Sequence, residues 1–203
     1  MVGGAGATLV TVMPAQEFAL FATAVGPCGI AWSARGIAGV QLPERSEGST
    51  RARLQRRYPS AREAAAPAHV EQAIDDIAAL LRGNARDLSA VALDTTNVTR
   101  FQQSVYSVAR GIPFGATLSY GEVAARLGDR RLAREVGEAL GQNPFPIIVP
   151  CHRVLAAGGK PGGFSAVGGV TTKLRLLDIE GAQVGGAPTL FERLPLAARP
   201  SRR

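Results

Sequence analysis

The spacing of apolar residues changes near residue 98, and this change constrains the fold more than any other feature. Before it, short apolar runs separated by Gly and Pro are typical of antiparallel strands: 18–25, 29–32 and 37–42. A helical repeat follows over 70–82 and stops at Gly83. After residue 98 the spacing is helical. Strands followed by helices predict a mixed α/β fold of the α+β type.

Smaller features of the first half are less regular. Residues 43–67 are charged and rich in Pro and Ala, which indicates a loop containing a short helix. Residues 84–99 read as a connection with a weak strand around Val91. The first half carries no convergent polar cluster, so we interpret it as a scaffold.

The second half contains two short helices joined by a glycine turn. Ser119 and Glu122 have the spacing of a capping box, in which each side chain binds a free backbone N–H of the helix start. That helix stops at Gly128, and Asp129 can cap a second helix over 130–141. Two helices in this arrangement predict a helix-turn-helix.

One face of the second helix combines cations with small residues. Arg130 and Arg134 lie one turn apart beside Gly137 and Gly141, so a nucleic-acid backbone can approach closely while the cations reach phosphates or bases. The alternative is a solvated basic face with two i,i+4 ion pairs, Arg131–Glu135 and Arg134–Glu138.

Charge supports a polyanionic partner. The chain has 23 Lys and Arg against 16 Asp and Glu, a net charge of +7, most of it after residue 100. The longest uncharged apolar stretch, 18–34, is interrupted by Gly and Pro, so no membrane span is expected. No basic segment precedes an apolar stretch at the N-terminus, so we expect no secretory signal and a cytoplasmic location.

The cysteines indicate single-thiol chemistry. Cys28 and Cys151 cannot build a disulfide framework, which is typical of an intracellular protein. With only His69 and His152 available, they do not meet the spacing of a structural zinc site, so no metal is expected.

The segment 142–154 carries the strongest chemical signal. Three prolines within seven residues stiffen the backbone before Cys151. His152 and Arg153 follow directly and favour the thiolate, which is the nucleophilic form of cysteine. A buried structural cysteine beside a chance histidine is the alternative for an isolated Cys-His pair.

The combined motifs resemble a known family. They are Asn143-Pro144, Pro146-Ile-Ile-Val-Pro-Cys-His-Arg-Val154, the helix that begins near Ser119-Tyr120, and Glu180-Gly181. Together they resemble the O6-alkylguanine-DNA alkyltransferases over residues 98–181. Before residue 98 only the β-then-α order agrees with that family. The resemblance implies a ribonuclease-H-like first domain (1–97), a mostly helical, winged-helix-like second domain (98–185) and a basic tail (186–203).

The resemblance also implies roles for individual residues. Cys151 accepts the alkyl group irreversibly, so each chain acts once. His152 takes the thiol proton through a water, and Glu180 holds and polarises His152. Tyr120 donates a hydrogen bond to the guanine ring, and Asn143 braces the turn before the active-site segment.

Further residues are expected to bind substrate or DNA. Arg134 fills the base stack when the alkylated nucleotide is flipped out. Ser165 faces O6, and the backbone carbonyls of Val149 and Cys151 accept from the guanine amine. Arg130, Gly137 and Arg153 complete the expected binding set. The recognition helix is expected to enter the minor groove, whose degenerate pattern suits a protein that must ignore sequence.

The expected partner is double-stranded DNA containing O6-alkylguanine, with O4-alkylthymine left open and no cofactor. We expect a monomer, with clustering along DNA left open. Phe164 stands where many members of the family have tyrosine, and the Gly-rich stretch 156–169 is longer than in some members. Two other functions remain open: a lesion-binding module that recruits repair factors, and a Cys-His hydrolase.

Overall fold

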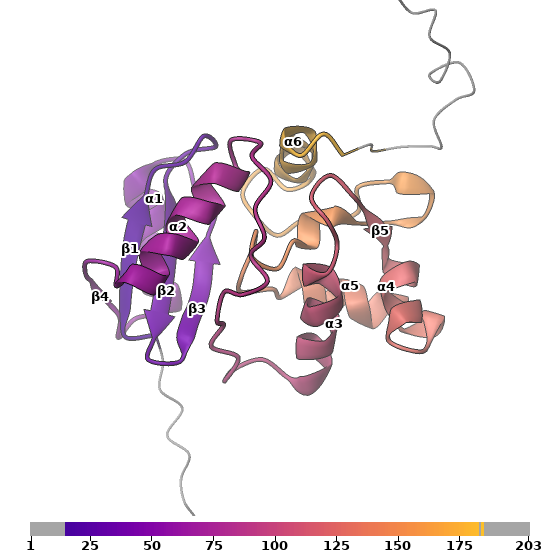
Figure 1. Ribbon diagram of the computed structural model, residues 1–203, viewed down its shortest axis with the longest axis horizontal. Coiled ribbons are helices and arrows are strands. Elements are labelled where there is room, and N and C mark those ends of the chain that lie inside the picture. Colours follow the sequence, from indigo (N-terminus) through magenta and orange to yellow (C-terminus); the bar gives the residue numbers. More distant parts are fainter. Residues whose placement is uncertain (1–14, 183, 185–203) are drawn as a thin grey trace, which may run out of the picture.

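The computed structural model describes residues 15–182 and 184. The predicted mixed fold is confirmed: a sheet and two helices form the first half, and short helices dominate the second (Figure 1). The first half contains β1 (Glu17–Phe21), β2 (Cys28–Ser33), β3 (Gly36–Gln41), α1 (Glu47–Arg57), β4 (Arg62–Glu63) and α2 (Ala68–Leu80). The predicted tail, 186–203, lies outside the described residues.

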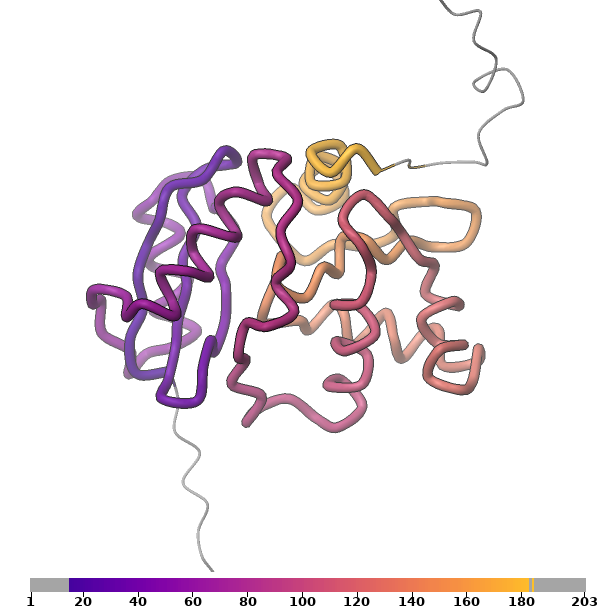
Figure 2. The backbone as a smooth tube through the Cα atoms, viewed as in Figure 1, coloured from indigo at the N-terminus to yellow at the C-terminus, as the bar shows by residue number. Residues whose placement is uncertain are grey.

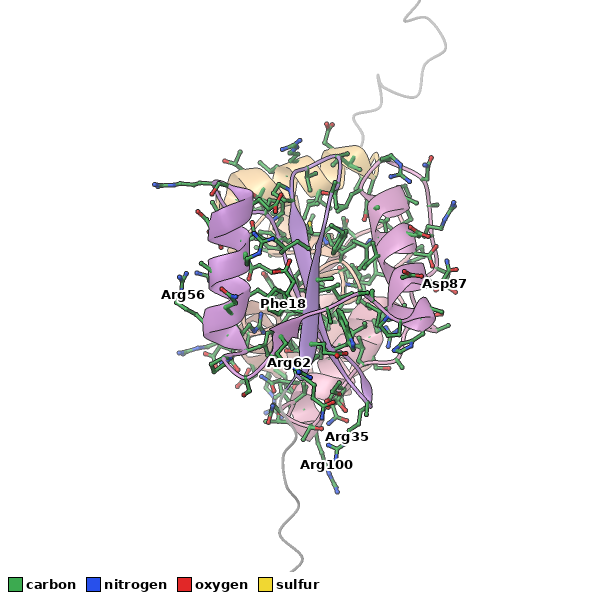
Figure 3. The ribbon with its side chains drawn as sticks, turned by 90° about the vertical axis from the view of Figure 1, so that its left-hand side faces the viewer. Phe18, Arg35, Arg56, Arg62, Asp87 and Arg100 are labelled. Carbon is green, nitrogen blue, oxygen red and sulfur yellow. The ribbon has the colours of Figure 1, made fainter. Side chains whose placement is uncertain are left out.

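The sheet has the strand order β3-β2-β1-β4. The expected antiparallel pairing of the first three strands is confirmed, and β4 adds a short parallel pair to β1. Helices α1 and α2 cover opposite faces of the sheet, with Phe18 between them in the view of Figure 3. The alternation of side chains along β2 explains this, because Ile30 and Trp32 join the main core while Ala31 packs with Phe18 on the α1 side.

The connection between the halves runs along the free edge of β3. Ile37 donates to the Ala92 carbonyl (2.9 Å), and Asp94 donates to the Ile37 carbonyl (2.7 Å). The strand expected around Val91 is reduced to a single bridge between Ile37 and Leu93. The tube in Figure 2 shows this connection passing between the two halves.

The second half contains α3 (Arg100–Arg110), β5 (Leu118–Ser119), α4 (Tyr120–Arg126), a 3-10 turn (Arg130–Leu132), α5 (Ala133–Gly141), β6 (Val154–Leu155) and α6 (Val170–Ile179). Two further 3-10 turns cover Cys151–Arg153 and Ala157–Gly159. Strands β5 and β6 form a short parallel pair that the sequence did not predict.

The predicted helix start at Ser119 is confirmed, since Ser119 and Glu122 form a reciprocal capping box. The second helix departs from the prediction because its first turn is a 3-10 turn. Asp129 accepts from the Arg131 backbone and also pairs with the Arg131 guanidinium (2.8 Å). The Arg131–Glu135 pair of the alternative interpretation is therefore not formed, because Asp129 takes the guanidinium.

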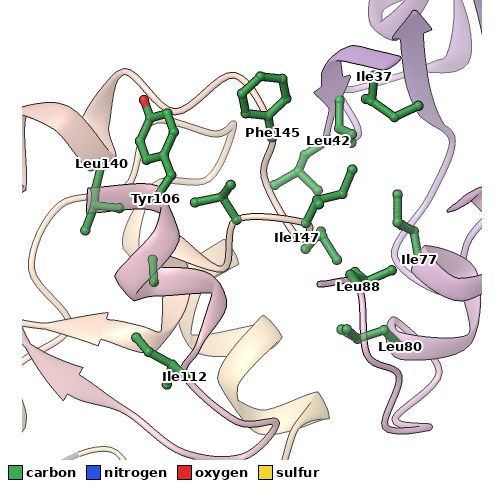
Figure 4. Packing of buried hydrophobic residues seen from close by; sticks show 14 of the residues in the cluster. Ile37, Leu42, Ile77, Leu80, Leu88, Tyr106, Ile112, Leu140, Phe145 and Ile147 are labelled. Carbon is green, nitrogen blue, oxygen red and sulfur yellow. The ribbon is translucent and has the colours of Figure 1, made fainter. Parts of the chain in front are cut away.

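One apolar cluster spans both halves (Figure 4). Ile37 and Ile77 from the first half lie in the same cluster as Phe145 and Ile147 from the active-site segment. Ile147 has a positive φ of 74°, which a β-branched residue adopts only when its surroundings impose it. The shared core therefore fixes the path of the chain just before Cys151. No helix in the described part of the chain is long and apolar enough to cross a membrane.

Candidate active site

Cys151 begins a 3-10 turn directly after the proline-rich segment. Its backbone N–H donates to the Val149 carbonyl (2.8 Å), which closes the chain tightly around the thiol. Burial raises the pKa of the Cys151 thiol, while the nearby Asn143 amide and the charge of Lys173 oppose that rise. The site thus supplies two groups that favour the thiolate in a desolvated position.

Asn143 holds the turn between α5 and the active-site segment. Its amide nitrogen donates to the Val149 carbonyl (2.8 Å), and its amide oxygen accepts from the Phe145 N–H (2.9 Å). The side chain thus replaces backbone partners that no helix or strand supplies there. These hydrogen bonds tie the start of the active-site segment to the backbone just before Cys151.

The Val149 carbonyl already accepts two hydrogen bonds, from Asn143 and from the Cys151 N–H. A carbonyl oxygen has two lone pairs, so neither remains for a guanine amine. The expected role of Val149 as a base contact is corrected on this ground. Val149 instead fixes the local turn around the thiol.

Three buried charged or titratable groups meet behind the thiol. His152 Nε2 lies 2.8 Å from Glu180 Oε1, and Arg153 binds both carboxylate oxygens of Glu180 (2.8 and 2.9 Å). Burial alone would raise the pKa of Glu180, but the hydrogen bonds from His152 and Arg153 lower it to about 2. Glu180 is therefore ionised, and a carboxylate accepts, so Nε2 of His152 carries the proton.

The other nitrogen of His152 is available. Burial lowers the pKa of His152, although its hydrogen bond to Glu180 opposes this, so the ring is neutral. Nδ1 is buried and has no hydrogen-bond partner among the described residues. A neutral imidazole with a free Nδ1 lone pair, next to a cysteine, is suited to accept a proton.

Arg153 does not have the role that the sequence predicted for it. The sequence placed it among the DNA- and substrate-binding residues, but its side chain is only 7% exposed. Besides Glu180, it donates to the Ile112 carbonyl (2.6 Å) and lies over the Phe114 ring. The guanidinium therefore neutralises a buried carboxylate, and it is not free to contact DNA.

Lys173 is a site residue that the sequence analysis missed. It lies on the buried face of α6, and its ammonium donates to the Val154 carbonyl (2.5 Å) and lies 5.8 Å from the centre of the Tyr120 ring. Burial lowers the pKa of Lys173 to about 8, and the Cys151 thiolate opposes that fall. The sequence contains a signal that could have identified Lys173. The helical repeat of a buried face places it with Leu176, Leu177 and Glu180.

A cavity of about 560 Å³ connects the thiol to the helix-turn-helix. Its lining includes five of the predicted site residues: Tyr120, Arg134, Gly137, Cys151 and Ser165. Burial raises the pKa of the Tyr120 phenol, so it remains a hydrogen-bond donor. We call this space the helix-side cavity. The cavity therefore lies between the thiol and α5.

The arginine side chains of α5 and of the 3-10 turn before it face outward. The Arg134 side chain is 88% exposed and pairs with Glu138 (3.1 Å), which is the second i,i+4 pair that the sequence indicated. Arg130 is exposed in the 3-10 turn, and Gly137 lies behind the Tyr120 ring. An exposed arginine beside the cavity mouth can exchange a glutamate for a phosphate or a base.

Within residues 15–182 and 184, no group of three or more His, Cys, Asp and Glu is arranged to hold a metal ion. The fold and site thus define a class: two-part proteins in which a partly buried cysteine, backed by a buried histidine and glutamate, lies beside a helix-turn-helix. Residues 100–182 match the family model described as the 6-O-methylguanine DNA methyltransferase, DNA binding domain.

Curated relatives match a large part of the chain. A methylated-DNA–protein-cysteine methyltransferase from Methanothermobacter thermautotrophicus is 34% identical over 182 residues, which is 88% of this chain and 95% of that protein. The protein of the same name from Mycobacterium tuberculosis is 41% identical over 126 residues, 62% of this chain and 74% of that one. The chain belongs to this methyltransferase family.

Solved structures agree with this assignment. The Mycobacterium tuberculosis OGT in complex with DNA superposes with a TM-score of 0.65 at 32% identity, covering 81% of this chain and 92% of that one. The O6-methylguanine-DNA methyltransferase of Pyrococcus kodakaraensis gives a TM-score of 0.64 at 25% identity, covering 82% and 100%. Both comparisons extend over the two halves of the fold.

Proposed function

We propose that this protein repairs DNA by transferring the alkyl group of O6-alkylguanine to the sulfur of Cys151. The observation that best supports this proposal is that Cys151 and Tyr120 line the same cavity as Arg134 of α5. The relatives named above support the reaction, and the structure of one of them with DNA supports the partner.

The chemistry follows from the groups around the thiol. The Cys151 proton passes through a water to Nδ1 of His152, and the resulting imidazolium is stabilised by Glu180. The thiolate attacks the carbon bound to O6, so an S–C bond forms as the C–O6 bond breaks. The departing guanine gains one proton, which balances the proton lost by the thiol. Tyr120 donates a hydrogen bond to the ring while negative charge develops on it.

The product explains a single turnover. A thioether has no leaving group that a thiol can displace, so thiol exchange does not regenerate Cys151. When the alkylated base is flipped out, Arg134 fills the space that it leaves in the base stack, and Arg130 contacts a phosphate. Ser165, at the edge of the helix-side cavity, is the proposed contact to O6, and Gly137 gives the DNA backbone close access.

Intact-protein mass after incubation with duplex DNA containing one O6-methylguanine tests the proposal. We expect a gain of one methyl group on Cys151, located by fragmentation, saturating at one per chain. Cys151→Ala should bind the same DNA without any mass gain. Transfer by Cys151→Ala would overturn the assignment, and a bound lesion left unrepaired by the natural chain would favour a lesion-binding module instead.

DNA affinity should depend on salt. Exposed arginines that contact phosphates release counterions, so raising salt from 50 to 200 mM should weaken binding by about tenfold or more for two or more contacts. Arg130→Gln should reduce the slope of log affinity against log salt by about one. An affinity for duplex DNA that does not fall with salt would contradict the electrostatic interface.

A further inference from the structure

A further cavity, of about 300 Å³, lies between the two halves of the fold. Arg57 and Tyr58, at the end of α1, line it from the first half. Gln102 and Tyr106 of α3 and Pro144 of the active-site segment line it from the second half. We call it the seam cavity. Its volume lies at the lower end of the range of small-molecule sites, which occur preferentially between domains.

Arg57 is the one cation among the described residues that line the seam cavity. Its guanidinium lies 5.6 Å from the centre of the Tyr58 ring, and the Tyr58 hydroxyl donates to the Ala38 carbonyl (2.8 Å), which fixes that ring. Burial and the Cys151 thiolate raise the pKa of Tyr106 to about 12, and the charge of Arg57 opposes that rise. The guanidinium therefore lies near α3 as well as α1. None of the ion pairs formed by the described residues includes Arg57.

The one carboxylate among the described lining residues, Asp94, does not bind this cation. Asp94 is 8% exposed, and its two oxygens accept hydrogen bonds from the hydroxyl groups of Ser33 (2.5 Å) and Thr96 (2.5 Å). The Thr96 N–H also donates to it (3.1 Å). Asp94 thus leaves the N–H donors of Arg57 to a ligand, and a planar guanidinium binds phosphate oxygens in pairs.

The rest of the lining suits a nucleobase. Tyr106 and Phe145 pack edge to face with their ring centres 6.3 Å apart and form an aromatic floor (Figure 4). Asn97, Gln102 and Gln142 supply amide groups, which pair with the edges of bases. Aromatic faces bind any base by stacking. A guanidinium, aromatic rings and amides around one cavity match the phosphate and the base of one nucleotide.

We propose that the seam cavity is a second nucleotide-binding site, in which Arg57 binds the phosphate and the aromatic and amide side chains hold the base. Two sources supply this chemistry: the bound DNA strand and a free nucleotide. Gln142 also lines a cavity of about 260 Å³ at Cys151, so the seam cavity adjoins the reaction site. With the strand as the source, the inference rests on the proposed function; with a free nucleotide, it stands by itself.

Equilibrium dialysis of the natural chain against dAMP tests the free nucleotide, with deoxyadenosine as the probe that lacks a phosphate. Adenine is used because amide side chains pair with its edge and because it carries no O6. Arg57→Gln should weaken dAMP binding about three- to tenfold, the effect of a charge-assisted hydrogen bond at an exposed arginine, and leave deoxyadenosine binding unchanged. Asn97→Ala should weaken the binding of both probes and leave that of inorganic phosphate unchanged.

The salt dependence of duplex binding tests the strand as the source. The duplex carries O6-methylguanine, and every chain carries Cys151→Ala so that no transfer occurs. With the strand in the cavity, Arg57→Gln should lower duplex affinity about three- to tenfold and reduce the salt slope by about one, while dAMP does not bind. Arg56→Gln is the matched control in both measurements and should change neither, because Arg56 precedes Arg57 in α1 and projects from its outer side (Figure 3).

The proposal is overturned if Arg57→Gln changes neither dAMP binding nor duplex binding, or if Arg56→Gln has equal effects, since the charge would then act without a site. A cavity that binds inorganic phosphate as tightly as dAMP also overturns it, because no base is then recognised. Failure of the natural chain to transfer methyl would instead overturn the proposed function, and the dAMP measurement would still decide the free-nucleotide site.

Discussion

Glu180 has two partners of different character. Arg153 is a permanent cation that neutralises the carboxylate, while His152 uses the remaining acceptor capacity to orient its ring. Burial lowers the pKa of His152 and the charge of Arg153 lowers it further, so the ring stays neutral and keeps Nδ1 as an acceptor. Arg153 is thus a positioning residue, which acts on the reaction through Glu180 and His152.

Removing Arg153 should be costly. Arg153→Gln leaves a buried carboxylate without its cation, and we expect a loss of about 3–5 kcal/mol in the free energy of unfolding. Urea denaturation measures this loss, and Arg82→Gln, at an exposed site on the surface, should change stability by less than about 0.5 kcal/mol. Equal effects of the two substitutions would contradict the role assigned to Arg153.

Acid should lower the free energy of unfolding, because it protonates the Glu180 carboxylate. The hydrogen bonds of His152 and Arg153 lower the pKa of Glu180 from 4.5 to about 2. A lowered carboxyl pKa contributes stability that is fully present above pH 4.5 and is lost as the pH falls towards 2, about 3 kcal/mol in all. Urea denaturation between pH 5.5 and 2.5 should show this loss, and Glu180→Gln should remove that part of the pH dependence. A parallel pH dependence in the two proteins would contradict it.

Lys173 should tune the thiol. Its positive charge favours the Cys151 thiolate, so Lys173→Met should raise the pKa of the thiol and move the pH dependence of alkyl transfer upward. A shift of one pKa unit corresponds to a rate about tenfold lower at pH 7.5. Single-turnover rates between pH 6 and 9 measure the shift, with DNA affinity as the check that the fold is intact. An unchanged midpoint would exclude this role.

At the scale of elements, strand β3 joins the sheet to the active-site segment. The Val40 N–H points away from β2 and donates to the Pro144 carbonyl (2.9 Å), one residue after Asn143. Gly39 permits this approach, because a side chain there would collide with the Tyr58 hydroxyl and lie 3.1 Å from the Pro144 oxygen. The edge of the sheet therefore supports the turn that holds the thiol.

Gly39→Ala tests this junction. We expect a loss of about 1–3 kcal/mol in unfolding free energy from overpacking, and slower alkyl transfer because the Asn143 turn is displaced. Gly48→Ala, in α1 with only Ser46 Oγ near the added carbon, is the matched control and should neither lower stability nor slow alkyl transfer. Transfer at the natural rate by Gly39→Ala would show that β3 does not position the turn.

The elements that could be predicted are those with local signals. Apolar periodicity gave β1 to β3 and α2, and the capping box at Ser119 gave the start of α4. The roles of Arg153 and Lys173 could not be predicted from local signals, because their partners lie far away in sequence. Arg153 binds Glu180, and Lys173 binds the Val154 carbonyl. The short β5–β6 pair was missed for the same reason, since two residues per strand leave no periodic pattern.

At the scale of the whole molecule, the main apolar core is shared by the two halves. Ile37, Ile77 and Leu80 of the first half belong to the same buried cluster as Ile112 and Ile147 of the second (Figure 4). Separating the halves would expose this apolar surface to water, so neither half has a complete core of its own. The expected boundary near residue 97 remains a division by sequence pattern, across which the packing is continuous.

A single unfolding transition should result. Trp32 is the only tryptophan of the chain and is buried in the first half, so its fluorescence reports that half. Far-UV circular dichroism reports mainly the helices, most of which lie in the second half. We expect the two signals to change at the same urea concentration, as in a two-state transition. Separate midpoints would show that the halves unfold independently.

The backbone at Ile147 has a consequence for the order of assembly. A β-branched residue does not enter the left-handed region by itself, so the segment before Cys151 gains its shape only when the sheet of the first half is there to pack against it. During synthesis the first half leaves the ribosome earlier, but its core is completed only when the second half packs against it. An incompletely folded chain therefore carries an ordinary cysteine, and the reactive thiol arises only as the last part of the core closes.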